Sequence, residues 1–164
     1  MPPSKTQFAD LYQAQYDRIY RVCRAYTGDA EEAADLTQEV FIQAWKGLER
    51  FEGRSQTYTW LYRIAVNTCL MEKRKRRLAY QPLNEQVTGR TPDAKSSLMD
   101  ERVSELYRHI AALPEADRLA ISLMLEKVPY PDIAQTLGVS ESNLRVRIHR
   151  IKKRLSKAFD HAKA

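Results

Sequence analysis

Amide, imidazole, guanidinium and ammonium side chains recur at helical spacing in residues 140–155, SESNLRVRIHRIKKRL. On a helix, Leu144, Ile148, Ile151 and Leu155 would form one narrow apolar stripe. The polar groups would cover the other faces, where they could bond phosphates and base edges in a DNA major groove. A solvated basic helix is the alternative for this segment alone. The candidate DNA-contacting residues are Ser142, Asn143, Arg145, Val146, Arg147, His149, Arg150 and Lys153.

The residues before this segment indicate how it is positioned. Residues 130–137 predict a short helix with Pro131 in its first turn. Gly138 supplies the left-handed residue that ends this helix, and Ser140 is a suitable N-cap for the next one. The pattern predicts a helix-turn-helix, which favours DNA contact over a solvated basic helix.

A second basic block follows a group of aromatic residues. The predicted helix from Trp60 ends in the run KRKRR at residues 73–77, and Tyr58, Tyr62 and Arg63 lie close to it. Stacking rings and phosphate-neutralising cations together suit single-stranded nucleic acid. Aromatic residues packed in a core beside a solvated charge run are the alternative.

Charge alternates along the 164 residues, of which 43% are hydrophobic. Residues 1–50 carry net charge −2, residues 51–80 carry +5, residues 81–138 carry −3 and residues 139–164 carry +6. Two contacts with a polyanion, and another partner for the acidic blocks, would explain this alternation.

No residues point to catalysis, a cofactor or a metal site. Cys23 and Cys69 lie in apolar helical patterns and are interpreted as reduced core thiols in preference to a redox pair. The histidines have no metal-ligand spacing, and there is no signal peptide or transmembrane run. We expect a cytoplasmic protein that is not an enzyme and does not insert into a membrane.

The fold is predicted to be all-α, because no strand-like alternation appears. Two small helical modules are expected, over residues 1–77 and 99–164. The polar residues 78–98 are predicted to be a flexible linker. Residues 51–59 are predicted to be a polar break between two helices of the first module.

The order of these segments resembles bacterial RNA polymerase sigma factors of the extracytoplasmic-function (ECF) class, which keep only regions 2 and 4. The resemblance rests on DLTQEVFIQAW at 35–45, FEGRSQTYTWLYRIAVN at 51–67 and the helix-turn-helix segment. It implies that residues 1–77 are region 2 and residues 99–164 are region 4. Region 4 would read the duplex −35 promoter element. Region 2 would bind core RNA polymerase and the single-stranded −10 element.

The resemblance also implies roles for individual residues. It implies −10 contacts by Arg54, Tyr58, Trp60, Arg63, Asn67, Lys73, Arg74, Arg76 and Arg77. It implies polymerase contacts by Asp35, Gln38, Glu39, Phe41, Gln43 and Trp45. Promoter DNA, core RNA polymerase and an anti-sigma factor are the implied partners. The family often has serine where Val146 stands, so we expect a distinct base preference there.

Two other classes of protein compete with this interpretation. One is a helix-turn-helix regulator that binds duplex DNA without polymerase, and the other is a helical interaction protein with no DNA role. The basic run beside aromatic residues favours the sigma factor over the regulator. The sequence does not indicate whether the two modules pack together in the free protein; a closed form would place the basic face of one module against the acidic helix of the other.

Overall fold

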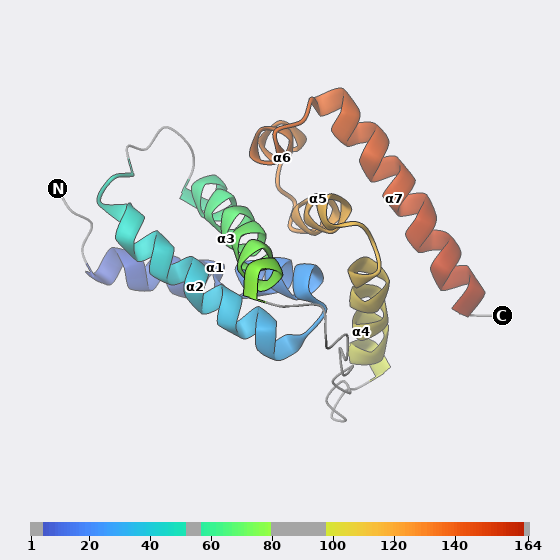
Figure 1. Cartoon of the computed structure of the whole chain (residues 1–164), viewed down its shortest axis with the longest axis horizontal. Helices are drawn as coiled ribbons and strands as arrows, with labels where there is room; N and C mark the ends of the chain where they lie inside the picture. The colour runs from blue at the N-terminus through green and yellow to red at the C-terminus, as the bar shows by residue number, and fades with distance from the viewer. Residues whose placement is uncertain (1–4, 52–56, 80–97, 163–164) are drawn as a thin grey trace.

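The computed structural model describes residues 5–51, 57–79 and 98–162 (Figure 1). Within these ranges all regular structure is helical, which confirms the all-α prediction. The helices are α1 (Lys5–Thr27), α2 (Ala30–Leu48), α3 (Thr57–Ala79), α4 (Leu98–Ala111), α5 (Glu115–Leu125), α6 (Tyr130–Leu137) and α7 (Glu141–Ala162).

Helices α1, α2 and α3 form one packed half of the molecule. Ile19 and Val22 of α1, Val40 of α2 and Leu61 of α3 are fully buried. Asp29 caps α2, since its side chain accepts a hydrogen bond from the amide of Glu32. The cap and the buried apolar face fix the rotation of α2, so its remaining face is presented outward.

Helices α5, α6 and α7 form the predicted helix-turn-helix with a preceding helix. Gly138 ends α6 in the left-handed conformation at φ 70°. The Ser140 hydroxyl caps α7 by accepting a hydrogen bond from the Asn143 amide over 3.1 Å. Leu144 is fully buried, and Ile148 and Ile151 are nearly so. These contacts turn the polar faces of α7 away from the core.

Some predicted boundaries were wrong. Helix α3 begins at Thr57, so Tyr58 lies in its first turn and not in a polar break that extends to residue 59. For the last helix no end was predicted; α7 runs to Ala162 and so includes residues after the segment 140–155. Helix α3 also continues two residues into the predicted linker, of which residues 80–97 lie outside the described residues.

The two halves of the molecule pack against each other. Helix α1 contacts α4 and α5, and α3 contacts α6. Figure 1 shows α5 and α6 between α3 and α7, with α7 on the outer side. Gly28, with φ 74°, lies where the halves meet, and a Cβ there would be 3.0 Å from the Cβ of Ala111. No described helix is long and apolar enough to cross a membrane.

Candidate functional site

The polar faces of α7 carry the predicted DNA-contacting residues. Ser142, Asn143, Arg145, Val146, His149, Arg150 and Lys153 are exposed, and Arg147 is half-buried. Val146 stands out among them, because it is an apolar residue with 51% of its surface exposed. The helix therefore presents hydrogen-bond donors around one methyl-bearing side chain.

Two of the arginines on α7 are held by other residues. Arg145 bonds Glu141 over 2.8 Å, and its guanidinium lies 4.9 Å from the centre of the Tyr130 ring. Arg147 lies 3.5 Å from an oxygen of Asp117 on α5. Arg150 and Lys153 have no partner among the described residues, so their charges are available to a ligand.

A groove of about 890 Å³ runs between the start of α5 and α7. Five of the predicted DNA-contacting residues line it: Asn143, Val146, Arg147, Arg150 and Lys153. The other three, Ser142, Arg145 and His149, do not line this groove. The predicted set therefore spans more than one side of the helix, which suits insertion between two phosphate backbones.

Residues of α3 form a second polar and aromatic surface. Asn67 and Arg74 are exposed, whereas Arg63 and Lys73 are partly buried. Tyr58 and Trp60 are also partly buried, and the Trp60 ring lies 4.9 Å from that of Phe51. Arg54 lies outside the described residues, and only the backbone of Arg76 and Arg77 is described, as part of α3.

A recess of about 350 Å³, called the α2–α3 recess below, lies between candidate residues of α2 and candidate residues of α3. Glu39 and Gln43 of α2 line one wall, and Trp60 and Asn67 of α3 line the other. Gln43 donates a hydrogen bond to Glu39 over 2.8 Å, which fixes the polar wall. A ring face beside amide and carboxylate groups can stack on a planar base and bond its edge.

The outward face of α2 carries a stripe of exposed residues, which we name the docking stripe: Asp35, Gln38, Ile42 and Trp45. They follow one another at three- and four-residue intervals, so they lie on one side of the helix. Ile42 is 48% exposed and Trp45 is 46% exposed. Large apolar groups flanked by a carboxylate and an amide are typical of a protein-binding surface.

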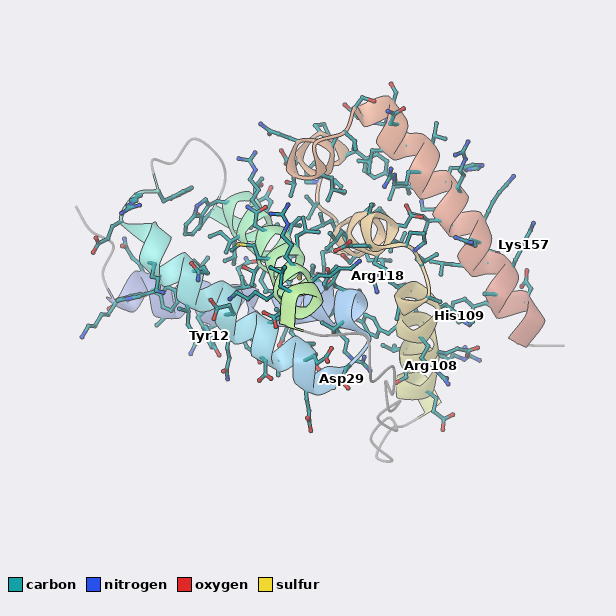
Figure 2. The ribbon with its side chains drawn as sticks, in the orientation of Figure 1. Tyr12, Asp29, Arg108, His109, Arg118 and Lys157 are labelled. Carbon is teal, nitrogen blue, oxygen red and sulfur yellow. The ribbon has the colours of Figure 1, made fainter. Side chains whose placement is uncertain are left out.

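Phe41 does not belong to this exposed stripe. It is 3% exposed and packs against an aromatic cluster on α1. Its ring centroid lies 4.7 Å from that of Tyr12, and Phe8 stacks edge-on against Trp45 at 5.0 Å. Figure 2 labels Tyr12 where this cluster lies. In this conformation Phe41 can support the docking stripe but is not presented on it.

Sequence reasoning missed several exposed or partnered groups. Ile42 completes the docking stripe, and its i, i+3, i+7 spacing from Asp35 and Gln38 was the signal for it. Arg21 of α1 forms a two-bond pair with Glu126, which follows α5, over 2.5 and 2.9 Å. No local pattern could have indicated that pair, because 105 residues separate its members.

The two cysteines are free and buried in the core of the first half. A hydrogen bond with Cys23, together with burial, raises the pKa of the Cys69 thiol. Among the described residues no group of three or more histidine, cysteine or acidic side chains could hold a metal ion. The polar groups of α2, α3 and α7 are therefore the candidates for function.

Comparison with known proteins connects these surfaces to one family. The family model for sigma-70 region 2 matches residues 11–79, and the model for sigma-70 region 4 matches residues 104–155. The chain is 33% identical to the RNA polymerase sigma-H factor of Pseudomonas aeruginosa, over 92% of this chain and 85% of that protein. It is 30% identical to the ECF RNA polymerase sigma factor SigW of Bacillus subtilis, over 92% of this chain and 87% of that protein.

Two solved structures share the fold. The sigma factor RpoE of Bartonella quintana, in complex with the anti-sigma factor NepR, matches with a TM-score of 0.78 at 21% identity, over 93% of this chain and 96% of that one. CnrH, in complex with the cytosolic domain of CnrY, matches with a TM-score of 0.72 at 19% identity, over 96% and 90% of the two chains. With both region models matched in chain order and relatives aligned over most of their length, this chain belongs to the ECF family of RNA polymerase sigma factors.

Proposed function

We propose that this sigma factor directs core RNA polymerase to promoters by dividing the work among three surfaces. The docking stripe of α2 binds polymerase, the α2–α3 recess and the basic end of α3 bind the −10 strand, and α7 reads the −35 duplex. The observation that carries the proposal is the α2–α3 recess, because polymerase and DNA candidates line the same 350 Å³. A partner bound to α2 would therefore adjoin DNA bound to α3.

For the −35 element, α7 enters the major groove. Arg150 and Lys153, which lack partners among the described residues, supply cations for guanine or phosphate, and Asn143 supplies an amide for adenine. Val146 reads a thymine through its methyl group, because an exposed valine offers apolar contact but no hydrogen bond. Arg145 and Arg147 keep their carboxylate partners or exchange them for phosphates. Ser142 and His149 contact DNA at the flank of the −35 element.

For the −10 element, bases leave the duplex and stack on region 2. Unstacking a base costs a few kcal/mol, and stacking on an aromatic ring returns about 1–3 kcal/mol per base. Trp60 and Asn67 line the recess that takes a base, and Tyr58 offers a second ring in the first turn of α3. The basic residues of the predicted −10 set bind the phosphate backbone of the DNA strand: Arg54, Arg63, Lys73, Arg74, Arg76 and Arg77.

For polymerase, the docking stripe supplies an apolar centre and a polar rim. Trp45 and Ile42 form the centre, and Asp35 and Gln38 form the rim. Glu39 and Gln43 lie at the edge where polymerase would meet the recess. We propose that the protein acts in the cytoplasm and has no catalytic chemistry of its own. We also propose an anti-sigma protein as a partner, since RpoE and CnrH were each solved with another protein bound.

The experiment that tests this proposal compares promoter binding with and without polymerase. Fluorescence anisotropy would measure affinity for a promoter duplex by the chain alone and by its complex with core polymerase. A sigma factor binds its promoter tightly only in the complex, whereas tight specific binding by the chain alone would support the regulator instead. Arg150→Ala should weaken the specific complex about 5- to 150-fold and relax one −35 position, the loss of about 1–3 kcal/mol expected for a base-reading arginine.

A further inference from the structure

The contact between the two halves of the molecule combines apolar residues of one continuous core with a set of charged and aromatic groups. On one side lie Arg21 and Tyr26 of α1 and Lys73 of α3, which we call the strand face. On the other side, Glu115 accepts hydrogen bonds from Tyr26 over 2.6 Å and from Lys73 over 2.8 Å. The Glu126 carboxylate receives both bonds from Arg21, and its side chain is 8% exposed. Two carboxylates of region 4 therefore neutralise cations of region 2.

The groups of region 4 resemble a nucleic acid strand in their chemistry. The Arg118 guanidinium lies 5.0 Å from the centre of the Tyr26 ring, so a planar group covers the ring face as a base would (Figure 2 labels Arg118). Glu115 and Glu126 place negative charge beside the cations, as phosphates would. Carboxylate and phosphate oxygens accept the same bonds from lysine and arginine. The strand face therefore fits an unpaired DNA strand when region 4 leaves it.

The contact has the features of one that opens. Arg118 Nε and Arg24 Nη1 are buried without a hydrogen-bond partner, which weakens the closed arrangement. The ion pair of Lys73 with Glu115 is partly exposed on both sides, so solvent screens it. Arg63 of α3 also donates to Gln135 of α6 over 2.7 Å. Two residues of the proposed −10 set, Arg63 and Lys73, are thus engaged by region 4.

The −35 surface is not engaged in the same way. Helix α7 packs on α4, α5 and α6, and Figure 1 shows it on the side away from α1–α3. Its exposed residues keep their access to a duplex. Closure of the two halves therefore blocks part of the −10 set while leaving the −35 set accessible.

We propose that the strand face of Arg21, Tyr26 and Lys73 is a binding surface for single-stranded DNA, and that Glu115 and Glu126 occupy it in the closed conformation. This inference rests on the proposed function and extends it by a surface on α1. Opening of the halves frees Lys73 and Arg63 together with Arg21 and the Tyr26 ring. Region 4 is then an internal competitor of the promoter strand.

The test uses the full chain with Glu115→Lys and Glu126→Lys combined. Its matched control combines Glu101→Lys and Asp160→Lys, which add the same charge at exposed residues that have no partner among the described ones. The probe is a fluorescein-labelled single strand of about 15 nucleotides, within the usual site size. Anisotropy gives its affinity over a salt series, and small-angle X-ray scattering without DNA gives the radius of gyration.

The charge-reversed pair should have a larger radius of gyration than the wild type and bind the strand at least fivefold more tightly than the control pair. Arg21→Ala added to the charge-reversed pair should remove about half of that gain on a logarithmic scale, because one phosphate contact is lost. The salt slope should become shallower by about 0.7 with that loss. If the charge-reversed pair does not fold, the charge-neutralised pair Glu115→Gln with Glu126→Gln replaces it. Its control is then Glu101→Gln with Asp160→Asn. The charge-neutralised pair should again have the larger radius of gyration and the tighter binding to the strand.

Three results would overturn the inference. An unchanged radius of gyration would mean that the two carboxylates do not hold the closed form. An expanded chain with no gain in affinity would mean that the strand face does not bind DNA. An equal gain in the control pair would assign the effect to overall charge. Polymerase-dependent transcription by the wild-type preparation separates these results from failure of the proposed function itself.

Discussion

Replacement of Trp45 by alanine is expected to weaken binding to core RNA polymerase without unfolding region 2. Trp45 is 46% exposed, and a large aromatic residue can bury up to about 250 Å². Covering the exposed part would remove about 115 Å² from water, worth about 3 kcal/mol at 25 cal/mol per Å². Incomplete coverage lowers this figure, so we expect a loss of about 1–3 kcal/mol, or roughly 5- to 150-fold in Kd.

The assay is fluorescence-detected binding of labelled sigma factor to purified core polymerase. Leu125→Ala provides a control, because Leu125 is also 46% exposed but lies on α5, away from the docking stripe. Ile42→Ala and Val103→Ala form a second matched pair, each at 48% exposure. Thermal unfolding of every variant shows whether the fold is kept. Equal losses for Trp45 and Leu125 variants, or no loss for Trp45→Ala, would refute the assignment of the docking stripe.

Three further predictions concern the helix-turn-helix and the contact between the halves. Leu144→Ala should lower the free energy of unfolding by about 2–5 kcal/mol in urea titrations, because Leu144 is fully buried; a loss below 1 kcal/mol would contradict its place in the core. Val146→Ala should leave stability within about 0.5 kcal/mol. In the wild type, replacing one thymine of the −35 element by uracil should weaken binding roughly fourfold, as expected for the loss of one methyl group. In Val146→Ala this loss should be smaller, because alanine reaches less far toward the thymine methyl; an unchanged loss in the variant would exclude the methyl contact. Burial acts to raise the pKa of Glu115, but hydrogen bonds from Lys73 and Tyr26 outweigh it and hold that pKa below its ordinary value. The ionised Glu115 therefore favours closure above about pH 4.5, and this contribution is lost as pH falls through the lowered pKa. The radius of gyration should rise in that acid range while circular dichroism stays native, and the rise should be smaller in Glu115→Gln; identical pH profiles for the two proteins would contradict it.

The helix-turn-helix could be predicted from sequence because local chemistry determines it. Gly138 is needed where the backbone turns left-handed, and Ser140 is needed where α7 begins with unpaired amides. The apolar stripe of Leu144 and its neighbours then fixes which faces of α7 remain exposed. Each of these signals depends only on residues that are close together in the chain, so the sequence alone is enough to predict the motif.

The start of α3, which was predicted wrongly, and the end of α7, which was not predicted, have weaker local signals. Thr57 begins α3 although the preceding residues look like a polar break, because apolar anchors such as Leu61 bury the first turns of the helix. The continuation of α7 past Leu155 adds residues with little apolar periodicity. Tertiary contacts and helix propensity extend both helices beyond what the apolar pattern indicates.

The closed arrangement could be expected only in outline. The sequence offered only a basic face of one module against the acidic helix of the other, whereas the contact joins cations of α1 and α3 to Glu115 and Glu126. The particular partners depend on how two folded surfaces fit, and Arg21 with Glu126 or Lys73 with Glu115 are separated by 105 and 42 residues. Phe41 shows the same limit within one module. Phe41 belongs to the same segment, residues 35–45, as the exposed residues of the docking stripe. Its own side chain is buried by aromatic residues of α1.

Run-off transcription with purified core polymerase tests the central claim most directly. Templates would be fragments of the source genome, with core polymerase alone and core polymerase plus this chain as the two conditions. Defined transcripts that appear only with the chain, and that weaken with both Trp45→Ala and Arg150→Ala, are the predicted result. Transcripts that are independent of the chain, or that are unaffected by both substitutions, would contradict the proposed use of α2 and α7.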